Sequence, residues 1–311
     1  MTLKIAIQMD PPEGLSPQSD TTLLLAEVAE KRGHTLYYYH PSQLSLCHPN
    51  VVARGHRFSL KPSERTYFQL GEEESIVLNQ MDVVLMRQDP PFDMHYITAC
   101  HFLEMLPKSV RVINDPYWVR NCPEKIFPYE LAEFMPPTLI SHDEKEIRSF
   151  LKEQKNAVLK PLYGYGGKSV FLLRENDENT DALLEFLLNA SREPVIVQTY
   201  LPEVKTGDCR MIFIHGNLSG VFARVPAETA IRSNLRVGGT AREHAMTPKQ
   251  KALAERLGPA LKERGLAIAG VDMIGDYLTE INITSPTGLR ALKKLYNTTP
   301  EKEFWDTLER A

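Results

Sequence analysis

The chain has 311 residues, a length that typically forms about two domains and can bury a sizeable core. Hydrophobic residues make up 42% and charged residues 24%, which is ordinary globular usage and excludes a disordered chain, a collagen or a disulfide miniprotein. The formal net charge of -4 makes the chain a poor non-specific binder of nucleic acid. The four cysteines form no Cys-x-x-Cys pair, which argues against a zinc ribbon, a redox motif or a secreted disulfide framework.

The apolar segments are all short. None approaches the ~18 residues of a membrane span. The N-terminal apolar stretch is too short and too broken for a signal peptide, and it predicts a first strand over residues 3–9. We therefore expect a cytoplasmic protein with reduced thiols, no membrane partner and no nucleic-acid partner.

The N-terminal third alternates between strand and helix patterns. Asp20 is the expected N-cap of a helix that ends at Gly33. The predicted strands cover residues 3–9, 35–39, 81–86 and 110–113, and the predicted helices cover 21–32 and 95–106. This order predicts a parallel sheet with crossover helices. Ligands of such sheets bind at the carboxyl ends of the strands, where Asp10 and Arg87 lie.

The remainder of the chain predicts two further groups of elements. Ser141 and Glu144 form an expected capping box, and Thr247 with Gln250 forms a second one. The helices predicted here cover residues 144–153, 180–190 and 248–264, and the strands cover 157–160, 169–173, 195–201, 210–214, 218–224, 267–274 and 277–284. The pattern therefore favours an α/β fold with an α+β C-terminal part.

A glycine-rich turn separates two of these strands. It contains Gly164, Gly166 and Gly167. A Walker A loop is excluded, because Leu162 stands where that motif needs glycine and a strand follows instead of a helix. Two interpretations remain equally weighted from the turn alone: backbone amides that cradle a phosphate, and an ordinary flexible hairpin tip.

Two lysines favour the phosphate interpretation. Lys160 ends an apolar strand just before the glycines, and Lys125 lies earlier in the chain. A lysine in such a place either extends to solvent or faces an anion. Two lysines together with the glycine amides would neutralise a triphosphate.

Polar residues alternate with apolar ones near residue 280. Glu280, Asn282 and Thr284 therefore share one face of their predicted strand. Asp272 is a carboxylate inside the preceding apolar strand, and buried carboxylates are rare unless they are paired or bind metal. Oxygen ligands two residues apart suit a hard cation. A merely solvent-exposed face is the alternative, and it explains Asp272 poorly.

The register of this hairpin decides whether the carboxylates can cooperate. A two-residue turn at Gly275 and Asp276 would pair Asp272 with Thr279 and leave Glu280 on the opposite face. A three-residue turn pairs Asp272 directly with Glu280. Joint metal binding therefore predicts the longer turn or a β-bulge.

The segment over residues 225–240 is long for a loop in a compact domain, which is typical of a functional lid or a linker. It carries Arg232, Asn234 and Arg236, with glycines that would hinge it. Arg210 and Arg224 flank the neighbouring hairpin and are suited to stabilise developing negative charge. Solvated arginines are the alternative for each of them alone.

Several segments together resemble the ATP-grasp carboxylate–amine ligases, and among them the prokaryotic glutathione synthetases. The resemblance covers residues from about 3 to about 290 in family order. The segments that carry it are residues 86–93 (MRQDPPFD), 159–162 (LKPL) with the glycine turn, 198–202 (QTYLP), 207–210 (GDCR), 270–276 (GVDMIGD) and 279–287 (TEINITSPT).

The resemblance implies an N-terminal three-layer domain over residues 1–122, a central ATP-grasp domain over 123–201 and a C-terminal domain over 202–311. ATP would lie between the last two. The implied reaction joins γ-glutamylcysteine to glycine through an acyl phosphate, with ATP and Mg²⁺ or Mn²⁺ as cofactors. The family also suggests a homotetramer.

The resemblance assigns roles residue by residue. The implied ATP-binding residues are Lys125, Lys160, Gly164, Gly166, Gly167, Gln198, Thr199, Tyr200, Leu201 and Asp208. The implied substrate residues are Arg87, Asp89, Arg210, Ser285 and Thr287, and the implied metal ligands are Asp272, Glu280 and Asn282. The expected catalytic residues are Arg210, Arg224, Arg232 and Asn234.

Lys168, Arg236 and Thr240 depart from residues that are common in the family at these places, which leaves the details of the two loops open. Two alternatives stay open from the sequence. One is another ATP-grasp ligase that joins an amino acid to a peptide, and the other is a non-catalytic nucleotide-binding subunit.

Overall fold

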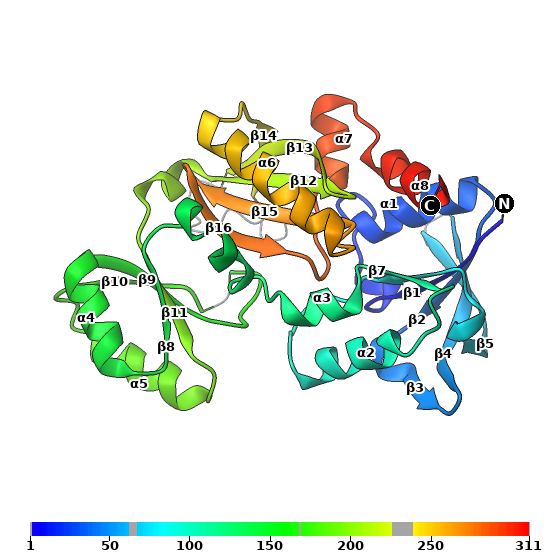
Figure 1. The fold of residues 1–311 in the computed structure, drawn as a ribbon, viewed down its shortest axis with the longest axis horizontal. Helices are drawn as coiled ribbons and strands as arrows, with labels where there is room; N and C mark the ends of the chain where they lie inside the picture. The colour runs from blue at the N-terminus through cyan, green and yellow to red at the C-terminus, as the bar shows by residue number, and fades with distance from the viewer. Residues whose placement is uncertain (1, 62–66, 168, 226–238, 311) are drawn as a thin grey trace.

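The chain folds around three β-sheets (Figure 1). The computed structural model describes residues 2–61, 67–167, 169–225 and 239–310. The N-terminal sheet lies at the right of Figure 1, the central sheet at the lower left and the C-terminal sheet above and between them. Within these described ranges no helix combines the length and the apolar composition needed to cross a membrane.

The N-terminal sheet has seven strands in the order β3-β4-β2-β1-β6-β7, with β5 paired to β4. Its parallel part comprises β1 (Lys4–Gln8), β2 (Thr35–Tyr39), β6 (Val83–Met86) and β7 (Arg111–Ile113). These are the strands that the sequence predicted. Strands in a parallel sheet are covered on both faces, which explains why β6 is apolar and buried throughout.

An antiparallel extension was missed from the sequence. It consists of β3 (Leu44–Cys47), β4 (Asn50–Leu60) and β5 (Phe68–Val77). The β5 strand contains Gly71 followed by three glutamates, and its middle is exposed. Such a composition lacks the apolar alternation that identifies a strand, and charges on an exposed edge strand oppose unwanted pairing with another chain.

The helices of this part are α1 (Thr21–Lys31), α2 (Met94–Glu104) and α3 (Pro116–Asn121), with short 3-10 turns η1 (Pro12–Gly14), η2 (Pro41–Gln43) and η3 (Leu78–Gln80). Asp20 caps α1 as predicted: its Oδ1 accepts a hydrogen bond from the Leu23 N–H at 2.8 Å. This cap fixes the segment that follows the carboxyl end of β1.

The central sheet has the order β10-β9-β11-β8. Its strands are β8 (Thr138–Ser141), β9 (Asn156–Pro161), β10 (Phe171–Arg174) and β11 (Val195–Thr199), and α4 (Glu144–Gln154) and α5 (Thr180–Ala190) pack on one face through a shared apolar cluster. The predicted capping box at Ser141 is wrong. Asp143 is the N-cap of α4, because its carboxylate accepts from the N–H groups of Lys145 and Glu146 while the Ser141 hydroxyl accepts from Asp143 N.

The C-terminal sheet has the order β14-β13-β12-β15-β16. Its strands are β12 (Asp208–Ile214), β13 (Asn217–Val225), β14 (Thr240–Glu243), β15 (Ile268–Ile274) and β16 (Tyr277–Asn282). The helix α6 (Pro248–Glu263) carries the predicted capping box of Thr247 and Gln250. The 3-10 segments η4 (Phe127–Phe134) and η5 (Pro202–Thr206) connect the sheets.

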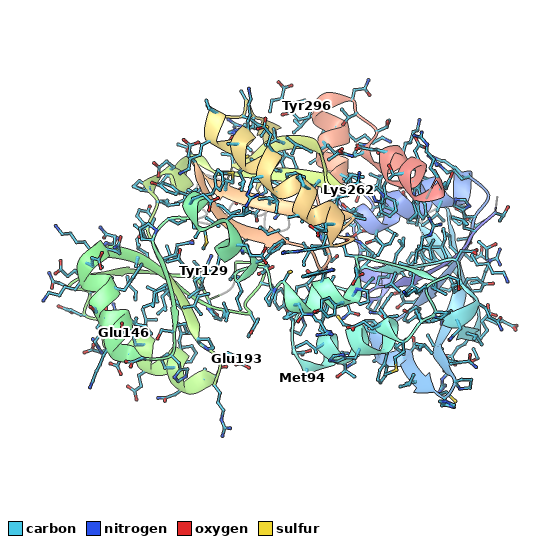
Figure 2. All side chains as sticks on the ribbon, viewed as in Figure 1. Met94, Tyr129, Glu146, Glu193, Lys262 and Tyr296 are labelled. Carbon is cyan, nitrogen blue, oxygen red and sulfur yellow. The ribbon has the colours of Figure 1, made fainter. Side chains whose placement is uncertain are left out.

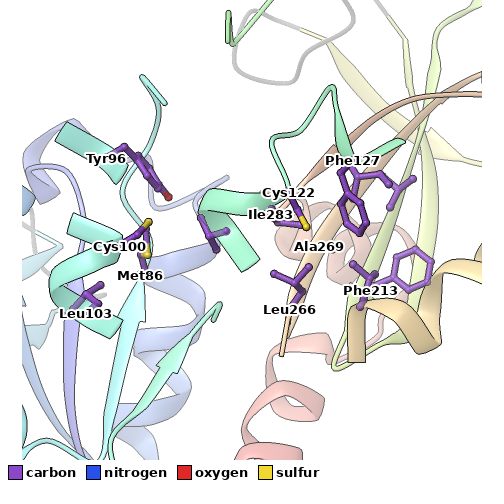
Figure 3. Close-up of a cluster of buried hydrophobic side chains, with 14 of the residues drawn as sticks. Met86, Tyr96, Cys100, Leu103, Cys122, Phe127, Phe213, Leu266, Ala269 and Ile283 are labelled. Carbon is purple, nitrogen blue, oxygen red and sulfur yellow. The ribbon is translucent and has the colours of Figure 1, made fainter. Parts of the chain in front are cut away.

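One apolar core joins the N-terminal and C-terminal sheets (Figure 3). It includes Tyr96 and Leu103 of α2 as well as Phe127, Phe213 and Ala269, which lie around the C-terminal sheet. The burial of apolar surface is the dominant favourable contribution to the free energy of folding. The two sheets are therefore held as a single packed unit.

The last two helices, α7 (Leu289–Tyr296) and α8 (Pro300–Arg310), were not predicted. The α8 helix packs beside α1, close to both chain ends (Figure 1). Trp305 is fully buried there, and its indole N–H donates to the carbonyl of Leu25 at 2.9 Å. The C-terminal helix thus ties the first helix to the rest of the molecule.

We predict that Trp305→Ala lowers the free energy of unfolding by about 3–5 kcal/mol, because it leaves a cavity and removes the hydrogen bond to the Leu25 carbonyl. Urea denaturation followed by circular dichroism measures this change. Lys302→Ala, on the exposed face of the same helix, serves as the control and should change stability by less than about 0.5 kcal/mol. Equal small effects in both variants would show that α8 contributes little to the fold.

Candidate active site

A cavity of about 160 Å³ lies where the three sheets meet. Its walls come from the segment before η4, the glycine turn after β9, the strands β12, β13, β15 and β16, and the loop that follows β16. The residues of the predicted site that line it are Asp89, Lys125, Lys160, Gly164, Gly166, Gly167, Arg210, Arg224, Asp272, Glu280, Asn282, Ser285 and Thr287. Residues from distant parts of the sequence therefore gather in one place.

The β15–β16 hairpin contains the expected bulge. Its turn has only two residues, Gly275 and Asp276, since Ile274 pairs with Tyr277 and Met273 with Leu278. The register then shifts, so that Asp272 pairs with Glu280 and Thr279 is the extra residue. Joint metal binding required either a three-residue turn or a β-bulge, and the structure has the β-bulge.

Asp272 lies in a ladder of buried charges. Arg210 donates to both of its carboxylate oxygens, with 2.8 Å between Nη2 and Oδ2. Arg224 Nη2 lies 3.0 Å from the same Oδ2, and Arg224 is also held by Asp208. Asn282 Nδ2 donates to Asp272 at 3.3 Å. The Asp272 carboxylate is therefore surrounded by two arginines and by the side-chain amide of Asn282, which is itself a predicted metal ligand.

Burial opposes the positive charge of Arg224, but Asp272 and Asp208 outweigh that effect and raise its pKa. Arg224 is consequently charged at every working pH. The predicted role of Asp208 in ATP binding is not tested by this geometry, in which its carboxylate holds the Arg224 side chain in place.

Glu280 is held by the two predicted phosphate-binding lysines. Its Oε1 lies 3.2 Å from Lys160 Nζ and 3.7 Å from Lys125 Nζ. Burial alone would raise the pKa of Glu280, but the two lysines outweigh it and lower the pKa to about 2. The carboxylate is therefore ionised throughout the neutral range.

Lys125 has two further partners, the carboxylate of Glu124 and the carbonyl of Gly164, which accepts from Nζ at 2.6 Å. The glycine turn thus rests on the lysine that is predicted to bind phosphate. Burial raises the pKa of Glu124 against the opposing effect of Lys125. Glu124 was missed from the sequence, because a glutamate next to a lysine is an ordinary surface pattern.

Three polar side chains position the loop after β16. Arg87 Nη2 donates to the Pro286 carbonyl at 2.9 Å, and Arg210 Nη1 donates to the Thr287 carbonyl at 3.3 Å. Asn114 Nδ2 donates to the Ile283 carbonyl at 2.6 Å, while its Oδ1 accepts from Ile268 N. Asn114 was also missed, because a single buried asparagine after a strand carries no sequence signal.

Close packing in this region requires a glycine. A Cβ atom at Gly270 would lie 2.8 Å from Arg210 Nη1 and 3.2 Å from Pro286. Either contact would displace a group that holds the site together. This explains the glycine at the point where β15 passes beneath the loop.

The segment over residues 198–201, which the family resemblance assigned to ATP binding, lies outside the cavity lining. The Gln198 side chain donates to Thr138, and the N–H groups of Thr199 and Tyr200 donate to the carbonyls of Pro137 and Asn156. Leu201 is buried at the start of η5. The contribution of these residues to nucleotide binding stays a prediction.

Four residues named from the sequence, Lys168, Arg232, Asn234 and Arg236, lie outside the described residues. Thr240, the remaining departure from the family pattern, is exposed and pairs with Val225 at the start of β14.

The residues present suit a divalent cation. Asp272, Glu280 and Asn282 offer the oxygen ligands that hard cations prefer, and the bulge places them on one face. Among the described ranges no three His, Cys, Asp or Glu side chains form a metal cluster of their own, so the set depends on the asparagine. The adjacent lysines and glycine amides suit phosphate oxygens.

Comparisons with known proteins bear on the identity of the site. Family models described as the N-terminal domain and the ATP-grasp domain of prokaryotic glutathione synthetase match residues 3–120 and 124–297. A glutathione synthetase of Brucella melitensis is 46% identical over 309 residues, and one of Mesorhizobium japonicum is 47% identical over 309 residues. In both cases 99% of each chain is covered.

Solved structures with low sequence identity share the fold. A D-cycloserine synthetase matches with a TM-score of 0.68 at 18% identity, covering 99% of both chains. A RimK-domain ATP-grasp protein of Sphaerobacter thermophilus matches with a TM-score of 0.65 at 18% identity, covering 97% of this chain and 98% of that one. The ATP-grasp fold and the family resemblance predicted from the sequence are confirmed. The chain belongs to the prokaryotic glutathione synthetase family of ATP-grasp ligases.

Proposed function

We propose that the chain joins γ-glutamylcysteine to glycine with the consumption of ATP, forming glutathione, ADP and phosphate. The prediction of ATP-dependent glutathione synthesis is confirmed by its family membership. The observation that carries the proposal is the set of four buried cations, Lys125, Lys160, Arg210 and Arg224, that face one cavity. Such a set suits a reaction in which two anions must meet.

The first step needs charge neutralisation. The cysteinyl carboxylate attacks the γ-phosphorus of ATP, and an acyl phosphate forms as ADP leaves. Lys125 and Lys160 are proposed to bind the phosphate oxygens, which offsets the repulsion between the two anions. Asp272, Glu280 and Asn282 would hold the divalent cation, for which we propose Mg²⁺ with Mn²⁺ as a substitute. When bound, this cation supplies a Lewis acid that polarises the phosphoryl oxygens.

The second step is an attack by the glycine amine on the acyl carbon, which expels phosphate. Arg210 and Arg224 lie on adjacent strands at the cavity wall and are proposed to stabilise the oxyanion. Arg87, Asp89, Ser285 and Thr287 are proposed to hold the peptide, with Arg87 acting on the loop through the Pro286 carbonyl. Arg232 and Asn234 stay proposed catalytic residues.

Water has to be excluded, because acyl phosphates hydrolyse. The cavity volume of about 160 Å³ is below the ~300–1,000 Å³ of typical ligand sites, so nucleotide entry requires a movement. The Gly164 carbonyl accepts a hydrogen bond from Lys125, the lysine that is proposed to bind phosphate. We therefore propose that the glycine turn moves away to admit the nucleotide and then closes over its phosphates.

The division into residues 1–122, 123–201 and 202–311, a cytoplasmic location and a homotetrameric assembly are further parts of the proposal. The first rests on the three sheets, although residues 127–134 pack against β16 of the C-terminal sheet. The cytoplasmic location rests on the short apolar segments and the scattered cysteines of the sequence, and the homotetramer rests on the family resemblance.

The direct test is a coupled ADP-release assay with MgATP, γ-glutamylcysteine and glycine, from which one component at a time is omitted. We expect release only when all are present, with glutathione identified by mass spectrometry. Release that persists without glycine, or that requires a different acceptor, would contradict the substrate assignment.

We predict that Glu280→Ala reduces turnover by at least about a hundredfold, because it removes a proposed metal ligand. The fold should be retained at reduced stability, since Lys125 keeps Glu124 as a partner when Glu280 is removed. Steady-state rates and far-ultraviolet circular dichroism measure the two effects. Glu243→Ala, an exposed carboxylate on β14 of the same sheet, is the control and should keep full activity. Normal turnover in the Glu280 variant would refute the metal assignment.

The depressed pKa of Glu280 predicts a pH dependence of stability. Its ordinary pKa of 4.5 falls to about 2 in the folded state, so its ionic contribution is complete above pH 4.5 and declines as the pH falls toward 2. The stability difference between the wild type and Glu280→Gln should therefore be constant from about pH 5 to 8 and shrink below 4.5. Urea denaturation at several pH values tests this, and a difference that grows on acidification would show that the lysines do not stabilise the carboxylate.

A further inference from the structure

A second and larger cavity adjoins the proposed reaction site. Its volume is about 1030 Å³, and it shares Asp89 and Thr287 with the cavity that holds the two lysines. Its walls are the segment from Asp10 to Asp20, the start of β14 and one face of α7. The smaller cavity has no room for a dipeptide beside a nucleotide, whereas the larger one has the size of a ligand site.

Asp10 and Lys294 are oppositely charged side chains of the larger cavity, and neither has an ion-pair partner among the described residues. Asp10 lies at the carboxyl end of β1, and its Oδ2 accepts from Asp89 N at 2.7 Å. Lys294 lies on the face of α7 that lines the cavity. By contrast, Arg290 on the same face is engaged by Glu27, by Tyr67 and by the Asp20 carbonyl.

The α7 helix is tied to its neighbours at both ends, so the backbone of Lys294 has a defined place while its exposed side chain can reach a ligand. The hydroxyl of Tyr296, labelled in Figure 2 at the end of α7, accepts from His244 N at 3.0 Å. Arg290 fixes the start of the helix to α1 through Glu27. A charge on an anchored helix can select a ligand group by position.

The dimensions fit a γ-linked dipeptide. Thr287, at the junction of the two cavities, precedes Gly288, which is the N-cap residue of α7. A helical rise of ~1.5 Å per residue places Lys294 about 9 Å further along the axis from Gly288. The arm of γ-glutamylcysteine between its reacting carboxylate carbon and its glutamyl α-carbon is about two residue lengths, or ~7 Å when extended, and the α-carboxylate that would meet Lys294 lies one bond further. An α-linked isomer would carry its ammonium group two bonds, or roughly 2–3 Å, nearer to the reacting carboxylate.

We propose that this cavity binds the glutamyl end of the dipeptide, with Asp10 facing its ammonium group and Lys294 facing its α-carboxylate. The inference rests on the proposed function and adds two specificity residues to it. The reacting carboxylate then remains beside Thr287 and Arg210, and the γ-linkage is selected by the position of the ammonium group along the peptide.

The test pairs two variants with three peptides. Asp10→Asn keeps an acceptor for Asp89 N, and Lys294→Met keeps the apolar stem of the side chain. The peptides are γ-glutamylcysteine, glutarylcysteine, which lacks the ammonium group, and 4-aminobutyrylcysteine, which lacks the α-carboxylate. The matched controls are Glu13→Gln, in the same segment as Asp10, and Lys302→Met; both residues are exposed and neither lines the cavity.

We expect each variant to lose about tenfold to a hundredfold in kcat/KM for γ-glutamylcysteine, the range for a hydrogen bond to a charged group, with an unchanged KM for ATP. With glutarylcysteine the Asp10 variant should equal the wild type, and with 4-aminobutyrylcysteine the Lys294 variant should equal it. The controls should match the wild type with all three peptides.

An equal loss with every peptide would mean that the residues act only on structure, and no loss would mean that the glutamyl end lies elsewhere; either result overturns the inference. Both are distinguishable from failure of the proposed function, in which the wild type makes no glutathione from γ-glutamylcysteine, glycine and MgATP.

Discussion

The site depends on the pairing of buried charges. Asp272 is bound by Arg210 and Arg224, and Glu280 is bound by Lys125 and Lys160. A buried ion is costly unless a counter-charge compensates for its lost hydration. None of these residues could occupy the cavity alone, so the sheets that carry them have to meet there. The Lys160–Glu280 pair in particular connects the central sheet to the C-terminal one.

This pairing also explains how the site could bind a nucleotide and a cation without leaving any buried charge uncompensated. In our proposal the nucleotide brings phosphate oxygens to the lysines, and the divalent cation brings positive charge to Asp272 and Glu280. Each group exchanges one counter-charge for another, so the cavity stays nearly neutral throughout. In this proposal the arginines then lose part of their hold on Asp272 and become available to the oxyanion of the second step, whose negative charge develops next to them.

Much of the site could be predicted because its residues belong to local sequence patterns, such as the alternation of polar and apolar residues along a strand. The alternation around Glu280 placed Glu280 and Asn282 on one face, and the need to bring Asp272 to that face predicted a longer turn or a bulge, of which the bulge is found. The strands β1, β2, β6 and β9 are apolar and buried, so their periodicity identified them. These residues obey rules that act over a few positions.

The remainder depends on contacts between distant segments. Asn114 bonds to Ile268 and Ile283, more than 150 residues away in the chain. Glu124 meets the distant strand β16, where its carbonyl accepts from Ile281 N at 2.9 Å. No local sequence pattern predicts contacts between residues that are so far apart in the chain. The β5 strand was missed for another reason: its charges serve an exposed edge and hide its strand character.

The exchange of counter-charges is the central claim, and a crystal structure of the chain with Mg²⁺ and a non-hydrolysable ATP analogue tests it most directly. The account predicts that Lys125 and Lys160 contact phosphate oxygens, that Glu280 leaves Lys160 to bind the cation with Asp272 and Asn282, and that the Gly164 carbonyl leaves Lys125. A nucleotide bound elsewhere, with the Lys160–Glu280 pair still intact at 3.2 Å, would contradict it.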